Sequence, residues 1–271
     1  MERPVRISVC QMTVENNKES NIEKAVGMIG TSAENHADMV LLPEMFNCPY
    51  ENSKFVEFAE SQDDGPTIKA LSNAAKENGV YIIAGSIPEI EEGKIYNSSF
   101  IFDSEGKIIG RHRKIHLFDI NIPGKISFKE SDTLTAGNET TVIDTGFCKI
   151  GVAICYDVRF PEIFRLMALK GAKLVIVPAA FNMTTGPLHW ELLMRARAVD
   201  NQVFMAAVSP ARNVKASYVA YGNSMVVDPW ANILVRADGE ENILYSDIQL
   251  SQVDKVRREL PLLAHRRNDI Y

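Results

Sequence analysis

The chain has 271 residues, of which 46% are hydrophobic, so it is long enough to bury a full core in one domain. Its 35 acidic and 29 basic side chains leave a net charge of −6, which argues against a nucleic-acid or anionic-membrane partner because no basic excess is available to neutralise phosphates. No apolar run approaches the ~20 residues that span a membrane, and the first residues lead directly into a strand-like segment, so we expect a soluble, cytoplasmic protein.

Predicted strands and helices alternate through the first half of the chain. Short apolar runs bounded by turn residues predict strands at residues 5–10, 39–42, 80–84, 95–102 and 107–111. Apolar residues spaced three and four apart predict a helix over residues 21–29, capped by Gly30, and a second over residues 68–75, ended by Gly79. Residues 119–138 show little periodicity and predict a long loop, which in a compact domain is usually functional.

The second half of the chain continues the alternation. Strands are predicted at residues 141–145, 149–154, 174–177, 203–208, 224–228, 233–236 and 243–248, and helices at residues 160–170, 190–199 and 253–259. Because most of these strands are apolar without polar alternation, we expect an α/β fold in which helices cover the faces of the sheets. No linker rich in Pro, Gly and Ser divides the chain, so residues 1–271 are predicted to form one domain. The segments VLLPE and VIVPA resemble each other and hint at an internal two-fold arrangement.

Cys155 lies between the predicted strand 149–154 and the predicted helix 160–170. That position exposes a side chain at a sheet edge and near the positive end of a helix dipole, which can lower the pKa of a thiol from ~8.5 toward neutrality. Cys155 is therefore a candidate nucleophile. The alternative is a small buried hydrophobic residue, which most free cysteines are, and the residues around Cys155 do not decide between the two.

A cysteine nucleophile needs a base and a donor for the oxyanion. Glu44 directly follows the apolar strand 39–42, where the active sites of α/β sheets gather, and a carboxyl group there can have a raised pKa suited to proton transfer. Lys114 follows the strand 107–111 and could donate to an oxyanion. The alternative for both residues is an ordinary solvated charge. The alternative bases are the five histidines, His36, His112, His116, His189 and His265.

The cysteines of the chain do not form a recognisable metal-binding or disulfide motif. The four cysteines of the chain, Cys10, Cys48, Cys148 and Cys155, are widely scattered. No Cys or His group has the spacing of metal ligands, and no Gly-rich phosphate loop is present. We therefore expect neither a metal site nor a disulfide framework.

Three segments, LLPEMFN around Glu44, RKIHLFD around Lys114 and GVAICYDVRFPE around Cys155, resemble the nitrilase, or carbon–nitrogen hydrolase, superfamily and follow its Glu–Lys–Cys order. The likeness covers essentially the whole chain, including the terminal RRNDIY. It implies an α-β-β-α sandwich whose protomers pair into a stacked α-β-β-α-α-β-β-α dimer, held in part by the C-terminal tails, or assemble into a higher homo-oligomer. It also implies that Cys155 is the nucleophile, Glu44 the general base and Lys114 the oxyanion donor, and that Glu130 helps to position substrate and water.

The reaction that this resemblance implies is the hydrolysis of an amide through a thioester on Cys155. The backbone N–H of Tyr156 would join Lys114 in holding the oxyanion, and no cofactor is needed. The likeness is greatest to the omega-amidase branch, in the segments IHLFDINIPGKISFKES, AAFNMTTGPLHWELL and SPARNVKASYVAYGNS, which implies small dicarboxylic acid monoamides such as 2-oxoglutaramate or 2-oxosuccinamate as substrates. The alternatives are an amidase of another branch, acting on deaminated glutathione or an N-carbamoyl amino acid, and a non-catalytic binding or scaffold protein.

Arg159, four residues after Cys155, is the candidate anchor for the distal carboxylate of such a substrate, because its planar fork suits that group. The resemblance favours this assignment, since carboxylate-binding members of the superfamily use arginine in this segment. The alternative for Arg159 is a structural ion pair with Glu162 or Asp157. The two omega-amidase-like loops suggest the other residues of the pocket wall, Tyr50, Phe181, Met183 and Thr184.

Overall fold

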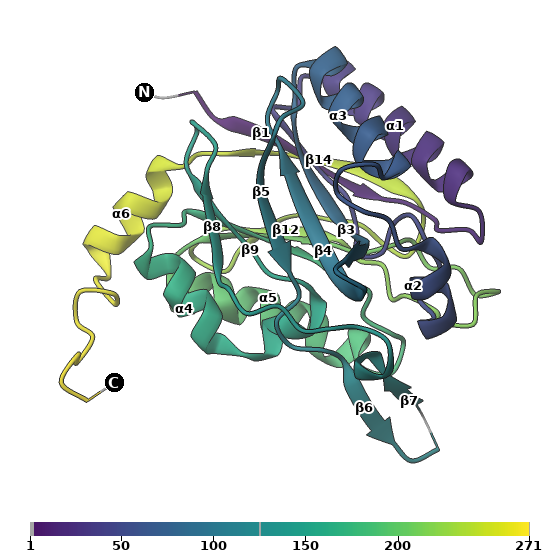
Figure 1. The fold of residues 1–271 in the computed structure, drawn as a ribbon. Helices are drawn as coiled ribbons and strands as arrows, with labels where there is room; N and C mark the ends of the chain where they lie inside the picture. The colour runs from purple at the N-terminus through teal and green to yellow at the C-terminus, as the bar shows by residue number, and fades with distance from the viewer. Residues whose placement is uncertain (1–2, 125, 271) are drawn as a thin grey trace.

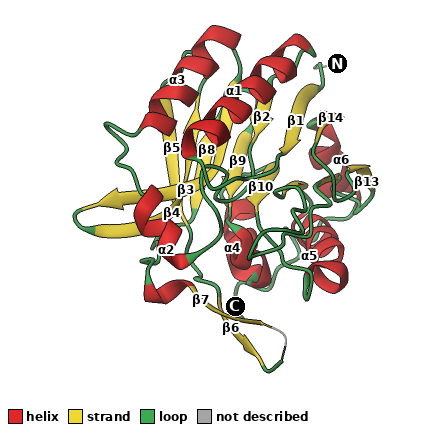
Figure 2. Ribbon diagram, turned by 90° about the vertical axis from the view of Figure 1, so that its right-hand side faces the viewer, coloured by secondary structure: helices red, strands yellow, loops and turns green. Residues whose placement is uncertain are grey.

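The computed structural model describes residues 3–124 and 126–270 and has the form of an α-β-β-α sandwich (Figure 1). Two six-stranded sheets pack face to face, and helices cover their outer faces (Figure 2). The fold class predicted from the sequence is therefore confirmed. Within residues 3–124 and 126–270, no helix is long and apolar enough to cross a membrane.

The first sheet holds the strands of the N-terminal half and one strand from near the C-terminus. In the order β14-β1-β2-β3-β4-β5 it contains β14 (Asn242–Ile248), β1 (Val5–Gln11), β2 (Met39–Leu41), β3 (Tyr81–Glu91), β4 (Lys94–Phe102) and β5 (Ile108–Arg113). The strands β1, β2 and β3 are parallel, and the other neighbours pair antiparallel. The helices that follow β1 and precede β3, α1 (Lys18–Glu34) and α3 (Pro66–Asn78), pack on the outer face of this sheet.

The second sheet repeats this plan with the second half of the chain. In the order β13-β12-β11-β10-β9-β8 it contains β13 (Ile233–Arg236), β12 (Met225–Val227), β11 (Phe204–Val208), β10 (Leu174–Pro178), β9 (Lys149–Val152) and β8 (Thr141–Asp144). Its parallel strands β9, β10 and β11 are joined by α4 (Pro161–Leu169) and α5 (Gly186–Asn201), and α6 (Ser251–Glu259) follows β14. The segments VLLPE and VIVPA thus contain equivalent strands, β2 and β10, at the centre of the parallel part of each sheet.

The apolar strands are buried on both faces, which is why their sequences show no polar alternation. In β10, Leu174 and Ile176 pack into the core between the two sheets. The alternate residues Val175 and Val177 pack into the layer that α4 and α5 form on the outer face. A strand with a core on each side needs apolar residues at every position, as parallel sheets of α/β proteins do.

Helix α1 is longer than the sequence predicted. It continues to Glu34, and Asn35 is its C-cap, so the prediction that Gly30 caps the helix is wrong. A glycine inside a helix costs only about 1 kcal/mol, and the buried Ile29 and Ser32 on either side of Gly30 anchor the helix to the sheet. A short helix that the sequence did not predict, α2 (Asn52–Phe58), buries two phenylalanines against the end of the sandwich.

The predicted loop over residues 119–138 contains a β-hairpin instead. Strands β6 (Asp119–Ile122) and β7 (Ile126–Lys129) pair antiparallel and project from the body of the molecule (Figure 1). The ring of Phe128 packs against the rings of Tyr50 and Phe118, with centroids 5.5 and 6.2 Å apart. A single turn of 3-10 helix, Glu130–Asp132, follows β7 and carries the buried Glu130 back into the sandwich.

Candidate active site

Three of the predicted site residues follow strands of the two sheets. Glu44 comes after β2, Lys114 directly after β5 and Cys155 shortly after β9. The side chains of Glu44 and Lys114 are completely buried, and Cys155 is 4% exposed. A buried charge is costly unless it is paired, so Glu44 and Lys114 each need a partner of opposite charge inside the protein.

The Lys114 ammonium is shared by two carboxylates. Its Nζ lies 2.9 Å from Oε1 of Glu44 and 2.9 Å from Oε1 of Glu130. The Tyr50 hydroxyl donates to Glu130 Oε1 over 2.6 Å and accepts from Lys114 Nζ over 3.3 Å. The other oxygen of Glu130 accepts from the backbone N–H of Phe118 over 2.6 Å. The structure thus joins Glu44, Lys114, Glu130 and Tyr50 in one buried network.

The Glu44 carboxylate is fixed by donors on both of its oxygens. Besides Lys114, Oε1 accepts from Asn97 Nδ2 over 2.9 Å, and Oε2 accepts from the backbone N–H of Ala180 over 2.7 Å. Ala180 follows β10, so the ends of the equivalent strands of the two sheets meet at this carboxylate. The Cys155 thiol also lies within hydrogen-bonding reach of Glu44. The carboxylate is therefore held in one orientation beside the thiol.

Cys155 adopts a backbone conformation that is rare for residues other than glycine. Its φ of 47° lies in the left-handed region, which costs a non-glycine residue ~1–3 kcal/mol and is found mainly at functional sites. It is the first residue of a turn of 3-10 helix, Cys155–Arg159, and α4 begins only at Pro161. The helix predicted after Cys155 is confirmed within one residue, whereas the prediction of an exposed thiol is wrong, because Cys155 is buried.

The surroundings of the Cys155 thiol favour its protonated form. Burial, followed by the charge of Glu44, raises the pKa of Cys155 well above its usual value, and Lys114 opposes that rise. The expectation of a thiol pKa near neutrality is therefore wrong, because it considered the helix dipole and neither burial nor nearby carboxylates. At neutral pH the thiol is protonated and needs a base before it can attack.

The Glu44 carboxyl group, which interacts with the Cys155 thiol, also has a shifted pKa. Burial raises the pKa of Glu44, with Lys114 opposing the rise and Glu130 adding to it. A raised carboxyl pKa suits a group that must take up a proton and later release it. Burial alone would lower the pKa of Lys114, but Glu130 and Glu44 raise it well above the usual value, so Lys114 remains a cation.

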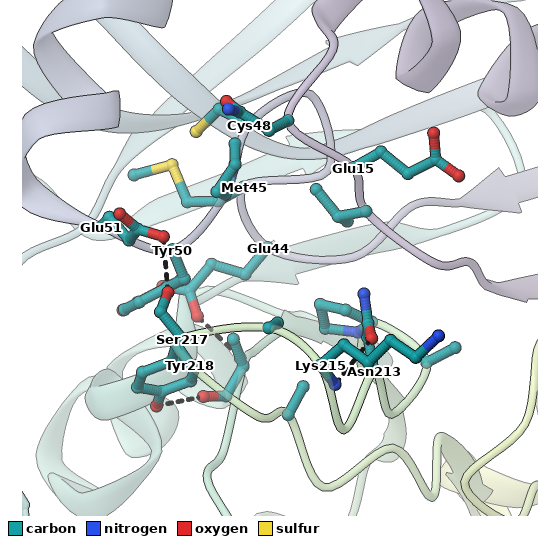
Figure 3. Close-up of a pocket in the computed structure, with 18 residues that line it drawn as sticks. Glu15, Glu44, Met45, Cys48, Tyr50, Glu51, Asn213, Lys215, Ser217 and Tyr218 are labelled. Atoms are coloured by element: carbon teal, nitrogen blue, oxygen red, sulfur yellow. Dashed lines mark hydrogen bonds between the residues drawn. The ribbon is translucent and has the colours of Figure 1, made fainter.

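Two cavities share Tyr218 and Ala180 as lining residues. The larger, of about 370 Å³, is lined by Glu44 and Tyr50 and by residues of the segment that carries Tyr218 (Figure 3). The smaller, of about 10 Å³, is lined by Cys155 together with Phe118, Tyr156, Arg159, Phe181, Asn182 and Thr185. The smaller cavity has room for about one water molecule. The Tyr218 ring, which lines both cavities, stacks on the Tyr50 ring with centroids 4.6 Å apart.

Arg159 lines the cavity beside Cys155 and has no acidic partner among residues 3–124 and 126–270. Its guanidinium lies over the rings of Phe181 and Tyr156, 5.1 and 5.6 Å from their centroids, and its Nη1 is 3.2 Å from Nδ1 of His189. Aromatic faces attract a cation but leave its N–H donors open. The position fits the predicted anchor for a substrate carboxylate.

The alternative of a structural ion pair for Arg159 is wrong. Within the described residues, neither Glu162 nor Asp157 lies within ion-pairing distance of the guanidinium. Asp157 instead accepts from His116 and from the backbone N–H of Ile154.

Two of the predicted wall residues lie elsewhere. Met183 is 43% exposed, and neither Met183 nor Thr184 lines either cavity. The backbone N–H of Thr184 donates to Asn182 Oδ1, which turns the loop so that Asn182 faces inward. Phe181 lines the smaller cavity and Tyr50 the larger, while the oxyanion role of the Tyr156 N–H stays a prediction.

Asn182 is a site residue that the sequence did not reveal. Its Oδ1 accepts from the backbone N–H groups of Thr184 and Thr185, which leaves the buried Nδ2 without a hydrogen-bond partner among the described residues. Burial raises the pKa of Tyr218, and the nearby Asn182 amide opposes that rise. The Asn182 side chain lines the cavity of Cys155 next to Tyr218, where its amide can bind an oxygen of the substrate. Nothing in the segment AAFNMTTG specifies which way the amide points, because its orientation depends on the turn.

No histidine contacts the Cys155 thiol in the part of the chain that the structure describes. His112 and His116 face Asp157, whereas His189 faces the arginine that lines the smaller cavity. The remaining two histidines, His36 and His265, are exposed at the surface. Over residues 3–124 and 126–270, no group of three or more His, Cys, Asp and Glu side chains is arranged to hold a metal ion.

Comparisons with known proteins agree with this geometry. A family model described as carbon-nitrogen hydrolase matches residues 6–258. Nitrilase homolog 2 of Dictyostelium discoideum is 50% identical over 272 residues, which cover 100% of this chain and 83% of that protein. Omega-amidase NIT2 of Mus musculus is 48% identical over 266 residues, which cover 98% of this chain and 96% of that protein. The crystal structure of Saccharomyces cerevisiae Nit3, a member of branch 10 of the nitrilase superfamily, has a TM-score of 0.91 at 40% identity and covers 98% of both chains.

Proposed function

The chain belongs to the carbon–nitrogen hydrolase family, and from that premise we propose that it acts as an omega-amidase, releasing ammonia from small dicarboxylic acid monoamides such as 2-oxoglutaramate and 2-oxosuccinamate. Several of its similar relatives are named omega-amidase, which supports amide hydrolysis as its reaction. The observation that carries the choice of substrate is the Arg159 guanidinium, which lines the cavity of Cys155 and pairs with no carboxylate in the described part of the chain.

In the first half of the reaction, Glu44 takes the proton of the Cys155 thiol and the sulfur attacks the amide carbonyl carbon. Lys114 and the Tyr156 backbone N–H hold the oxygen that becomes negative, and each such donor stabilises the transition state by ~3 kcal/mol. Glu44 then gives its proton to the amide nitrogen, the C–N bond breaks, and ammonia leaves. The product is a thioester between the substrate acyl group and Cys155.

In the second half, a water molecule attacks the thioester carbonyl while Glu44 takes a proton from that water. The C–S bond breaks, Glu44 returns the proton to the Cys155 sulfur, and the free acid leaves. Glu130 fixes Lys114 and Tyr50 throughout, which keeps the oxyanion donor in place in both halves. One carboxylate thus moves every proton, and no cofactor takes part.

The distal carboxylate of the substrate is proposed to bind Arg159. A planar guanidinium can donate two parallel hydrogen bonds to a carboxylate, and charge-assisted bonds of this kind contribute ~1.5–3 kcal/mol. The Asn182 Nδ2 donor lines the same cavity and can accompany Arg159 in holding the substrate oxygens. A charged anchor of this kind explains a preference for dicarboxylic monoamides over neutral amides.

The test compares Arg159→Met with the wild-type protein on two amides of equal length. We expect kcat/KM for ammonia release from 2-oxoglutaramate to fall roughly ten- to a hundredfold, and that for uncharged pentanamide to change little. The exposed Arg258→Met serves as the matched control and leaves both values unchanged. Equal losses on both amides, or a sharply lowered Tm, would assign Arg159 a structural role and remove the basis for the proposed substrate.

The same assay separates the alternative functions. If the wild-type protein hydrolysed deaminated glutathione or an N-carbamoyl amino acid far faster than 2-oxoglutaramate, its activity would be that of another branch of the family. Ammonia release from none of these compounds would favour a binding or scaffold role. The intact network around Glu44, Lys114 and Cys155 supports a catalytic protein.

We also propose that the protein is a homodimer that pairs through the outer helical layer. Helices α4 and α5 expose apolar side chains, 46% to 72% accessible, at Leu169, Leu166, Leu192 and Leu188. Replacing Leu188 and Leu192 with glutamate should give monomers in light scattering coupled to gel filtration, and a wild-type monomer would contradict the proposal. The cytoplasmic location stays a prediction.

A further inference from the structure

Asp157, two residues after the nucleophile, is completely buried and accepts hydrogen bonds from two separate segments. Its Oδ2 accepts from the backbone N–H of Ile154 over 2.9 Å. Its Oδ1 accepts from the backbone N–H of His116 over 2.9 Å and lies 2.8 Å from the His116 Nδ1. The His112 Nε2 is 3.5 Å from Oδ2. The reaction described above makes no use of this carboxylate.

One of these contacts closes the turn that carries the nucleophile. The backbone N–H of Asp157 donates to the carbonyl of Ile154 over 3.0 Å, so that Ile154 and Asp157 exchange two hydrogen bonds around Cys155. The left-handed backbone of Cys155 is strained, and such a conformation persists only when its surroundings hold it. The Asp157 carboxylate supplies part of that restraint.

The other contacts reach the segment that carries the oxyanion donor. His116 lies two residues after Lys114, whose backbone N–H donates to the Asn97 carbonyl over 2.8 Å. The Lys114 segment is thus held by Asn97 on one side and by Asp157 on the other. Burial would raise the pKa of Asp157, but hydrogen bonds from His112, His116 and Ile154 keep it below its usual range, so the carboxylate is ionised at neutral pH.

We propose that Asp157 is a positioning residue for amide hydrolysis, because its single carboxylate ties the turn of Cys155 to the segment of Lys114 and so fixes the nucleophile relative to the oxyanion donor. The inference rests on the proposed function. A neutral amide cannot replace the carboxylate, since asparagine has one acceptor and would turn its NH₂ group toward the N–H of either Ile154 or His116.

The first test is Asp157→Asn. A displacement of about 1 Å between reacting groups can cost ~100-fold in rate, so we expect kcat to fall by about that factor, with KM changed less than about twofold. The exposed Asp63→Asn serves as the matched control and keeps the wild-type kcat. A merely structural role would lower the Tm and leave the kcat of the folded protein unchanged, and that result would overturn the proposal.

The second test uses His116, which is partly exposed and tolerates change more easily. Asparagine carries a nitrogen where histidine carries Nδ1, so His116→Asn keeps the side-chain donor to Asp157 and His116→Ala removes it. Both variants lose the stacking of the imidazole on Phe160, whose centroid is 3.6 Å away, so their difference reports the hydrogen bond alone. We expect His116→Ala to lower kcat about fivefold below His116→Asn, with equal KM.

The outcomes of the two tests separate this inference from the function on which it rests. If Asp157→Asn does not fold, the His116 pair decides, and equal kcat values for its two members would overturn the inference. An active wild-type protein with unaffected variants overturns only the role of Asp157. A wild-type protein that releases no ammonia from any amide overturns the proposed function and this inference with it.

Discussion

Replacing Glu44 with glutamine removes the proposed base and also disturbs the hydrogen bonds that hold it. The carboxylate accepts from Lys114 and Asn97 at Oε1 and from the Ala180 N–H at Oε2. A glutamine side chain has one acceptor oxygen, so its NH₂ group faces one of these donors in either orientation. The substitution keeps the shape of the side chain and still leaves a buried donor unsatisfied.

The contacts of Glu44 determine how much stability and how much activity the substitution should remove. One unsatisfied buried donor costs ~1–3 kcal/mol. The larger cost of an unpaired buried charge is avoided because Lys114 keeps Glu130 as a counter-ion at 2.9 Å. We therefore expect Glu44→Gln to fold with a free energy of unfolding ~1–3 kcal/mol lower than the wild type. Its kcat/KM should fall ~10²–10⁴-fold, which is the usual contribution of a general base.

The assay measures ammonia release from 2-oxoglutaramate beside thermal unfolding followed by circular dichroism. Glu60→Gln is the matched control, because Glu60 is a buried carboxylate that accepts from the Thr67 N–H and lines neither cavity. It should lose stability and keep its activity. The reasoning is refuted if Glu44→Gln retains turnover within about threefold of the wild type, or if a histidine variant such as His189→Ala is inactive while Glu44→Gln is not.

Two further predictions follow from the pKa shifts of the site. Glu44 must be ionised to accept the thiol proton, so kcat/KM should fall as the pH drops through the Glu44 pKa, which burial and then the charge of Glu130 raise. Glu130→Gln should therefore move this acidic limb of the pH profile to lower pH. A move to higher pH would contradict the effect of Glu130 on the Glu44 pKa. Because the pKa of Cys155 is raised, the rate of its alkylation by iodoacetamide, measured by peptide mass spectrometry, should still increase with pH above pH 9.0. An alkylation rate that levels off near neutrality would instead support a thiol pKa lowered by the helix dipole.

The elements that could be predicted from sequence are those in which burial dictates the spacing of apolar residues. Ile163, Phe164 and Met167 fall on one face of α4, and the periodicity gave its position to within one residue. The hairpin β6–β7 was missed although isoleucines and a phenylalanine alternate with polar residues along both strands, because each strand is only four residues long. A period of two over so short a run does not stand out from a polar loop.

The site could be predicted only where a local pattern marks it. Glu44, Lys114 and Cys155 each follow a strand, and short motifs surround them. Asn182 and Asp157 gave no such signal, because their roles depend on a turn and on residues far away in sequence. The pKa of Cys155 was predicted in the wrong direction for the same reason, since the burial and the carboxylates that raise it come from other segments of the chain.

The most direct measurement of the central claim is the mass of the protein when turnover of 2-oxoglutaramate is stopped with acid. The mechanism predicts an acyl group on the peptide that contains Cys155 in the wild-type protein. Cys155→Ala, with an unchanged circular dichroism spectrum, should carry no acyl group and release no ammonia. Ammonia release by Cys155→Ala, or an acyl group on Cys10, Cys48 or Cys148 in place of Cys155, would contradict the account.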